Sequence, residues 1–322
     1  MKAITQDVYG SADVLAFSDV DKPTVGEHDV LIRVHAAGVD MGVWHLMEGI
    51  PYPVRAGFGV RAPKNRVPGT DVAGIVEEVG VRVTRLRAGD EVFGTCKGSF
   101  AEYARGQEDG FVLKPANVTF EQAAAIPISA LAALQAVRDK ANVQPGQRVL
   151  AIGAAGGVGT YAVQLAKAFG AHVTGVCSTT KVDLVRSIGA EDVIDYKKDD
   201  FAARARDFDV ILDIAGGRPV SQLRRALTPT GTLVIVGNEH GGRWFGGMDR
   251  MFGALLLSPF VKQRLVGLLS LPRKADLEYL AEIIGSRKVT PVVDRTYPLS
   301  EVPEAIRYVA AGRARGKVVI TG

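Results

Sequence analysis

A glycine-rich segment in the middle of the chain has the residue types and the spacing of a site for a nucleotide pyrophosphate. The apolar run 148–152 leads directly into Ala154-x-Gly156-x-x-Gly159, and apolar positions at helical spacing follow from Val158. Small residues let the backbone approach the pyrophosphate, whose charge is held by free N–H groups and the positive end of the helix dipole. The order strand, turn, helix predicts a dinucleotide-binding turn. The alternative is a tight turn that only packs the helix on the strand.

The segment about 20 residues further on favours NADPH over NADH. An NAD site carries a carboxylate there for the ribose 2′-hydroxyl, but residues 171–182 contain no Asp or Glu. Ser178, Thr179 and Lys181 offer two hydroxyls and an ammonium instead, which suit a 2′-phosphate. Capping of the next helix by the hydroxyls and a solvated face for the lysine remain open. Tyr196 either flanks the adenosine or is an ordinary surface tyrosine.

The elements around this turn predict an α/β protein of two domains. Residues 1–125 read as short strands between turn signals, which indicates an irregular antiparallel β domain. A helix is expected over 123–140. After it, apolar runs alternate with segments of helical period, as in βαβ units around a buried parallel sheet. The strands are expected at 148–152, 173–176, 192–194, 210–212 and 233–236. A closing strand–helix–strand, with its helix near 301–311, could return to the first domain.

Composition excludes several classes of function. The 322 residues carry a net charge of +4, but Lys and Arg are scattered rather than gathered into runs, so no nucleic-acid partner is expected. Cys96 and Cys177 cannot build a disulfide framework and have no metal-ligand spacing, which fits a reducing compartment. No apolar stretch approaches the roughly 20 residues of a spanning helix. We expect a cytoplasmic protein.

The whole chain resembles the zinc-independent quinone oxidoreductase branch of the medium-chain dehydrogenase/reductase superfamily. The matching stretches are Val67-Pro68-Gly69-Thr70-Asp71-Val72-Ala73-Gly74, residues 87–94 (RAGDEVFG), the turn 154–159 with Gln164-Leu165-Ala166-Lys167, and residues 315–319 (RGKVV). The resemblance implies a GroES-like catalytic domain of residues 1–125 and 271–322. It also implies a Rossmann NADP-binding domain of residues 126–270, with a substrate cleft between the two.

The resemblance also implies a set of cofactor contacts spread over the loops that follow the parallel strands, together with one residue of the tail. These are Ala155, Gly156, Gly157, Val158, Ser178, Thr179, Lys181, Tyr196, Ala215, Gly216, Val236, Gly237 and Lys317.

Departures from zinc-dependent relatives indicate a zinc-free enzyme. Those relatives carry Cys where this chain has Val39, and a His-Glu pair where it has Thr70-Asp71. Without a Lewis acid, the alkoxide of a simple carbonyl is hard to stabilise. Hydride added to a quinone or to the β-carbon of an enone instead gives an anion that hydrogen-bond donors can steady. We expect a reductase of quinones or α,β-unsaturated carbonyls.

Two other functions remain open, a secondary-alcohol dehydrogenase and a non-catalytic NADPH-binding sensor or structural protein. The missing zinc ligands disfavour the first.

Candidate catalytic residues follow the same resemblance. Asp40 stands where the family usually places Asn, and we expect it to accept from the nicotinamide amide or to be partly protonated. Tyr52 is the candidate acid or hydrogen-bond donor, with aromatic packing as the alternative. The substrate pocket is expected to use Trp44, His45, Phe58 and Phe93. For Phe93, core packing is an equal alternative.

Residues 243–274 combine aromatic and leucine side chains with several Arg and Lys residues. This composition fits a lid or subunit-interface helix followed by an edge strand near 265–269. The alternative is a basic amphipathic surface in peripheral contact with a bilayer. We expect the chain to form a homodimer.

Overall fold

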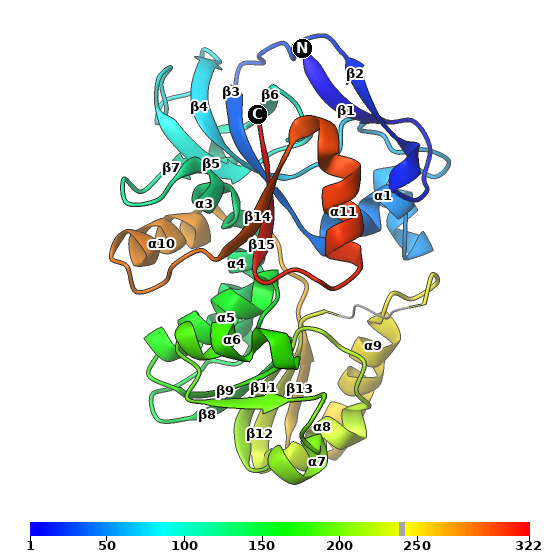
Figure 1. Ribbon diagram of the computed structural model, residues 1–322, viewed down its shortest axis with the longest axis vertical. Coiled ribbons are helices and arrows are strands. Elements are labelled where there is room, and N and C mark those ends of the chain that lie inside the picture. The colour runs from blue at the N-terminus through cyan, green and yellow to red at the C-terminus, as the bar shows by residue number, and fades with distance from the viewer. Residues whose placement is uncertain (238–241) are drawn as a thin grey trace. The chain divides into compact units, whose positions relative to one another are not determined.

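The computed structural model describes residues 1–237 and 242–322, which form two compact units (Figure 1). The first comprises residues 1–131, 272–287 and 291–322, and the second comprises residues 132–271 and 288–290. Within the described ranges, no helix has the length and apolar character needed to cross a membrane.

The first unit is built on a seven-stranded, mainly antiparallel sheet, as the sequence predicts. The strand order is β14-β15-β3-β4-β5-β7. The seventh strand, β6, lies outside this order and pairs with β3. The strands are β3 (Asp29–Val39), β4 (Asp71–Val79), β5 (Glu91–Thr95), β6 (Tyr103–Gln107), β7 (Phe111–Leu113), β14 (Val293–Pro298) and β15 (Lys317–Thr321). The C-terminal strand β15 runs antiparallel to β3, with Val318 opposite Val39. The tail therefore does return to the first domain.

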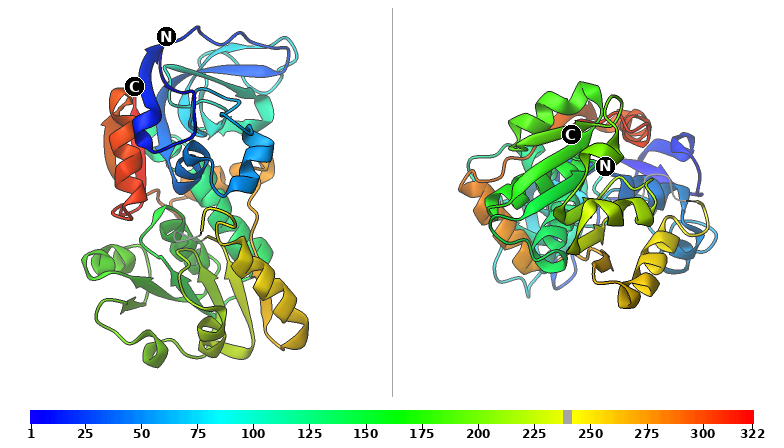
Figure 2. Two further views of the ribbon diagram at one scale, coloured as in Figure 1. Left: turned by 90° about the vertical axis from the view of Figure 1, so that its right-hand side faces the viewer. Right: turned by 90° about the horizontal axis from the view of Figure 1, so that it is seen from below.

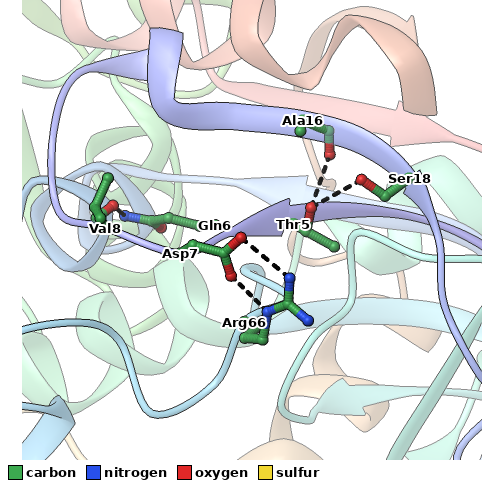
Figure 3. Close-up of polar contacts among 7 residues, drawn as sticks. All are labelled: Thr5, Gln6, Asp7, Val8, Ala16, Ser18 and Arg66. Atoms are coloured by element: carbon green, nitrogen blue, oxygen red, sulfur yellow. Dashed lines mark hydrogen bonds and ion pairs between the residues drawn. The ribbon is translucent and has the colours of Figure 1, made fainter.

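A two-stranded ribbon, β1 (Lys2–Gln6) with β2 (Leu15–Asp19), completes this unit. Side-chain contacts stabilise this ribbon. The Thr5 hydroxyl hydrogen-bonds to Ser18, and Asp7, directly after β1, pairs with Arg66 (Figure 3). Gln6 donates to the carbonyl oxygen of Met47, at the end of α1. The helices of the unit are α1 (Met41–Glu48), α2 (Arg55–Phe58), α3 (Phe120–Ala124), α10 (Lys274–Gly285) and α11 (Val302–Ala310). Short 3-10 helices are η1 (Ala12–Val14), η2 (Tyr52–Val54), η3 (Glu108–Gly110) and η7 (Leu299–Glu301).

The helix expected over 123–140 is interrupted once, at residues 125 and 126, between α3 and α4 (Pro127–Leu134). From Leu134 the chain continues without a gap into the π-helical η4 (Gln135–Lys140). Pro127 opens α4, because proline lacks the N–H that a helix interior needs but suits a first turn. The prediction of one continuous helix was therefore wrong, although the segment is helical for most of its length.

The second unit is a six-stranded parallel sheet with the order β10-β9-β8-β11-β12-β13. The strands are β8 (Arg148–Ile152), β9 (His172–Cys177), β10 (Asp192–Asp195), β11 (Phe208–Asp213), β12 (Leu227–Ile235) and β13 (Arg264–Gly267). This is the doubly wound dinucleotide-binding order, whose ligand crevice lies where the order reverses. Here the reversal falls between β8 and β11.

Helices cover both faces of the parallel sheet, which is why its strands read as nearly continuous apolar runs. Figure 1 shows α5 and α6 on one side and α8 and α9 on the other, and Figure 2 gives two further views. The helices are α5 (Gly157–Ala168), α6 (Val182–Ser187), α7 (Phe201–Arg204), α8 (Val220–Ala226) and α9 (Met248–Leu257), with η5 (Thr179–Lys181) and η6 (Ser258–Phe260). Leu150, Ile211 and Leu233 are fully buried in the core between these layers.

Candidate functional site

The turn between β8 and α5 leaves no room for side chains where helix and strand meet. A Cβ on Gly159 would lie 2.0 Å from the carbonyl oxygen of Gly153, so this position requires glycine. Gly153 has φ of 87° and lies against Ala215. A Cβ on Gly156, in contrast, would meet nothing closer than 3.5 Å. The turn is thus tight against the sheet at Gly159 and open at Gly156.

The open side of this turn is the N-terminus of α5. Gly156 is the N-cap residue and has no side chain to satisfy the first N–H groups of the helix. Those N–H groups have no acceptor within the helix, and the helix dipole adds partial positive charge beside them. An anion such as a pyrophosphate fits this position. The predicted contacts Ala155, Gly157 and Val158 belong to the same turn.

Two further loops meet the turn at the point where the strand order reverses. The N–H groups of Ile214 and Ala215 donate to the carbonyl oxygen of Ile152, at the end of β8. Val236 and Gly237 donate to the carbonyl oxygen of Asp213, at 2.9 and 3.4 Å. The structure therefore brings the loops after β8, β11 and β12 together. They contain the predicted contacts Ala215, Gly216, Val236 and Gly237.

Asp213 fixes this arrangement, and the sequence reasoning missed it. Its carboxylate is fully buried, accepts from the Gly216 N–H at 3.2 Å and pairs with Arg250 at 2.6 Å. Burial raises the pKa of Asp213, and Arg250 opposes that shift. An acidic residue directly after a run of buried apolar residues was the available signal. Asp213 thus orders the Ala215-Gly216 loop through the backbone.

The segment after β9 keeps its hydroxyl groups out of helix capping. Ser178 occupies the N-cap position of η5, but its side chain makes no capping hydrogen bond. Thr179 is exposed, and its hydroxyl bonds to the carboxylate of Asp195, at the end of β10. Lys181 is half-buried at the start of α6. The capping alternative is therefore not realised for Ser178.

Asp195 is a second residue that the sequence reasoning missed. The hydrogen bond from Thr179 holds the pKa of this carboxylate below its usual range, helped by the N–H of Lys197. The next residue, Tyr196, is 47% exposed, and the Lys197 ammonium lies 5.4 Å from its ring. The next strand, β10, thus supplies a carboxylate to this segment, followed by two lysines at 197 and 198.

In the first unit, Asp40 begins helix α1. One of its oxygens accepts from the Val43 N–H at 3.0 Å, which is an ordinary N-cap. The other oxygen is buried, makes no hydrogen bond among the described residues, and lies 3.6 Å from the ammonium of Lys317. An Asp just before a helical apolar run was a capping signal that the sequence reasoning did not use. The predicted nicotinamide contact would use this second oxygen.

Lys317 is only 1% exposed and joins two carboxylates. Its ammonium lies 3.2 Å from Asp71 and 3.6 Å from Asp40. Asp71 has no exposed surface, and its other oxygen accepts from the Ile128 N–H at 3.0 Å. Desolvation raises the pKa of Asp71 to about 7, Lys317 opposes the shift and Asp40 adds to it. We call Asp40, Asp71 and Lys317 the buried charge cluster. The expected cofactor contact of Lys317 stays a prediction.

His45 lies near this cluster without joining it. Its Nδ1 is buried and has no hydrogen-bond partner among the described residues, and burial lowers the pKa of the imidazole while Asp40 opposes that shift. Its ring is 4.8 Å from the ring of Trp44. Val39, at the position of a ligand in zinc-dependent relatives, is 2% exposed. The site around Asp40 therefore offers a neutral imidazole and apolar surface.

A cavity of about 850 Å³ lies within the first unit. Phe58, which is 53% exposed, lines it together with Tyr9 and Val43. The other predicted pocket residues are not part of its wall. Phe93 is fully buried in β5, which favours the packing alternative for this residue.

Tyr52 also lies outside this wall, in η2, with the guanidinium of Arg55 at 4.9 Å from its ring. Arg55 is itself held by the carbonyl oxygens of Gly49 and Glu48. This contact gives the ring a defined position, and it leaves both the donor role and the packing alternative open.

Known proteins resemble the chain over nearly its whole length. Residues 26–116 match the alcohol dehydrogenase GroES-like domain, and residues 188–320 match the family described as zinc-binding dehydrogenase. The chain is 32% identical to the chloroplastic quinone-oxidoreductase homolog of Spinacia oleracea, over 99% of this chain and 98% of the relative. It is 34% identical to the 2-methylene-furan-3-one reductase of Solanum lycopersicum, over 99% of this chain and 79% of the relative. A mycobacterial protein solved in complex with NADPH superposes with a TM-score of 0.85 at 25% identity, and both chains are covered completely.

Proposed function

Because this chain belongs to the quinone oxidoreductase branch of the medium-chain dehydrogenase/reductase superfamily, we propose that it is an NADPH-dependent, zinc-free reductase of quinones or α,β-unsaturated carbonyls. The observation that carries the proposal is the turn at the strand-order reversal. It is closed at Gly159, open at Gly156, and faces the unsatisfied N–H groups of α5. A solved relative with NADPH supports the cofactor, and a relative named 2-methylene-furan-3-one reductase, whose name describes an α,β-unsaturated ketone, supports the substrate class.

The residues around the turn fit a dinucleotide. The N-terminus of α5 would hold the pyrophosphate, and the loop carrying Ala215 and Gly216, ordered by Asp213, would lie along the nicotinamide half. Ser178 and Lys181 would meet the 2′-phosphate at the end of β9. Asp195, at the end of β10, accepts from Thr179 and from the Lys197 N–H, which holds its carboxylate beside this segment.

The choice of cofactor can be tested at Lys181. Lys181→Ala is expected to weaken NADPH binding by about 1.5–3 kcal/mol and to leave NADH binding nearly unchanged, because only the phosphate form gains a charge-assisted contact. Fluorescence titration with both cofactors measures the difference. Lys288→Ala, an exposed lysine of the same unit, is the matched control and should bind both cofactors as the parent does. An equal loss of both cofactors on Lys181→Ala would place this lysine outside the phosphate site.

The absence of zinc from the chemistry can be tested directly. Val39 and Thr70 stand at two ligand positions of zinc-dependent relatives, and neither side chain can replace the cysteine or histidine it stands for. We expect the purified protein to contain no stoichiometric zinc by elemental analysis and to keep its activity in a chelator. One tightly held zinc per chain would contradict this prediction.

The chemistry follows from the absence of a Lewis acid at these positions. When bound, NADPH supplies a hydride to the electrophilic carbon of the substrate. The protein must then steady an enolate or phenolate oxygen with hydrogen-bond donors and deliver one proton. Tyr52 is the proposed donor. A simple ketone yields a localised alkoxide that such donors stabilise poorly, which disfavours a secondary-alcohol dehydrogenase.

Steady-state oxidation of NADPH by a panel of quinones, enones and simple ketones tests the proposal. Turnover with quinones or enones, and little with ketones, is the expected result. Tight NADPH binding without turnover on any acceptor would instead support the non-catalytic sensor. Preferential turnover of ketones and secondary alcohols would support the alcohol dehydrogenase. The panel also separates quinones from enones as the preferred class.

A further inference from the structure

Helix α9 is apolar on the face that packs into the protein and on the face that points to solvent. Ala254 is fully buried in the core of the second unit, and Met251 and Leu257 pack against that core. On the outside, Phe252 is 58% exposed and Leu256 74%. A helix that is apolar all round is normally covered on both sides.

The outward apolar side chains continue past the end of the helix. Phe260, in η6, is 84% exposed and follows Phe252 and Leu256 at intervals of four residues. Phe252 and Leu256 lie about one turn apart on α9, and Phe260 extends this stripe into the 3-10 turn that follows the helix. Leu255, 61% exposed, widens it. We call these four residues the α9 stripe.

Charged residues are nearly absent from this helix. Asp249 and Arg250 are the only two in α9, and both lie in its first turn. Arg250 is directed inward, where its guanidinium pairs with the buried Asp213. The rest of the outer face is therefore a continuous apolar surface, of the kind that marks an interaction site rather than ordinary solvent-facing protein.

A cationic hollow lies at the end of the stripe. It has a volume of about 550 Å³ and is lined by Arg224, Arg225 and Lys262, together with Ser221 and Phe260. Among the described residues, no carboxylate lies within ion-pair distance of these three cations. The hollow is therefore positively charged and uncompensated, and Phe260 belongs both to it and to the stripe.

The hollow is a built feature. Gln263 accepts from the Arg224 guanidinium at 2.9 Å and donates to the carbonyl oxygens of Arg224 and Thr228, at 2.9 and 3.2 Å. These bonds tie the segment that carries Phe260 and Lys262 to helix α8, which lies beside α9 in Figure 1. Cations and apolar side chains are thus held next to each other on one surface.

We propose that this surface docks on an anionic phospholipid bilayer. The α9 stripe would enter the boundary between headgroups and acyl chains, and the hollow would receive the phosphate of a lipid headgroup. Amphipathic elements bind at this depth, about 5–10 Å into the interface, through apolar area combined with basic residues. The bilayer surface attracts each nearby Lys or Arg. Docking needs neither cofactor nor substrate, so it does not rest on the proposed function.

The positive charge of this surface favours a bilayer over a second copy of this chain as its binding partner. A twofold dimer that buries this surface would enclose the hollows of both subunits, and with them two sets of the cations Arg224, Arg225 and Lys262. Asp249 is the only carboxylate on α9 that could compensate them. An anionic lipid surface places negative phosphates beside the cations of the hollow, while its acyl chains contact the α9 stripe.

Vesicle co-sedimentation tests the proposal on the full chain. The protein should sediment with vesicles of phosphatidylcholine mixed with phosphatidylglycerol and stay in the supernatant with phosphatidylcholine alone. Binding should fall as salt is raised to about 1 M, where the Debye length is about 3 Å. Failure to sediment with the anionic vesicles would overturn the proposal.

Two double variants separate the two parts of the surface. Arg225→Gln with Lys262→Gln should weaken binding about 25-fold, because each cation near an anionic surface contributes a factor of about five. Leu256→Ser with Phe260→Ser should weaken it about tenfold or more through lost apolar burial. Matched controls with the same substitutions, Lys288→Gln and the 88%-exposed Val81→Ser, should bind as the parent does.

Measurement of the oligomeric state tests the competing explanation, that the α9 stripe is a subunit interface. If the parent ignores anionic vesicles while sedimentation velocity shows a dimer that Leu256→Ser with Phe260→Ser abolishes, the stripe is a subunit interface and the proposal is wrong. Parent-like vesicle binding by both double variants would likewise overturn it, because another surface would then hold the lipid. Circular dichroism of each variant verifies that its fold is retained.

Discussion

Replacing Asp71 by asparagine is expected to remove a pH dependence of about 3 kcal/mol from the folding stability between about pH 5 and about pH 8. Asp71 has no exposed surface, and desolvation raises its pKa from 3.8 to about 7. An acid whose pKa is raised on folding binds its proton more tightly in the native state. Its contribution to stability is therefore complete below pH 3.8 and is lost as the pH rises through about 7.

The parent should thus lose stability relative to Asp71→Asn as the pH increases, over a total of about 4 kcal/mol for the full shift. The difference between the two proteins is the relevant quantity, because other groups titrate in both. Chemical denaturation of each protein at the two pH values measures it. A constant difference would show that Asp71 keeps an ordinary pKa beside Lys317.

Asp19→Asn is the control with the opposite sign. Asp19 is exposed, and its hydrogen bond from Lys2 lowers the pKa of its carboxyl. Its contribution is present at neutral pH and lost as the pH falls. The parent should therefore lose stability relative to Asp19→Asn toward low pH, by a small amount because the pair is solvated. The difference in folding stability between parent and variant should therefore change with pH in opposite directions for Asp71→Asn and Asp19→Asn.

The sequence predicted those parts of the fold and site that depend on neighbouring residues. The run 148–152, the glycine turn and the first turns of α5 are consecutive, so their order and spacing could be read directly. The other parallel strands were recognisable in the sequence as short apolar runs, because helices bury both of their faces. The break at Pro127 was equally local and was overlooked because the alanine-rich segment around it has helical spacing.

Residues that meet across long stretches of chain were not predictable in this way. Lys317 and Asp71 are 246 positions apart, and the pairing of β15 with β3 together with that of β3 with β4 brings them together. The hydrogen bond between Thr179 and Asp195 likewise depends on the parallel pairing of β9 with β10. A search for a carboxylate within one segment therefore missed the acid that the neighbouring strand supplies.

Asp40 shows how both kinds of information combine. Its place before α1 was visible as a capping signal, which explains one of its two oxygens. The environment of the other oxygen, buried and 3.6 Å from Lys317, comes from the tertiary fold. An ionised Asp40 beside developing negative charge on a substrate would be unfavourable, and the Lys317 ammonium offsets that charge. This leaves Tyr52 as the candidate donor in the proposed reaction.

Tyr52→Phe is expected to lower turnover on a simple enone about 100-fold or more, with a smaller fall on a good quinone acceptor. An enolate needs a donor at its oxygen while charge builds and a proton at its carbon before it collapses to product, whereas a quinone yields a more stable, aromatic anion. Losing one donor in an oxyanion-type site costs about 2.7–4 kcal/mol. Steady-state rates on both acceptors, with a titration of NADPH, measure the effect, and NADPH affinity should stay nearly unchanged.

The position of the ring makes this substitution a fair test of the hydroxyl. Arg55 lies 4.9 Å from the ring of Tyr52 and is held by two backbone carbonyl oxygens, so phenylalanine can keep the same place. Tyr103→Phe, at a half-buried tyrosine on β6 whose ring contacts Lys22, is the matched control and should reduce both acceptors at the parent rate. If Tyr52→Phe also keeps the parent rate on both, Tyr52 only packs beneath its loop. The proton donor must then be sought at Asp40, at His45 or in a bound water.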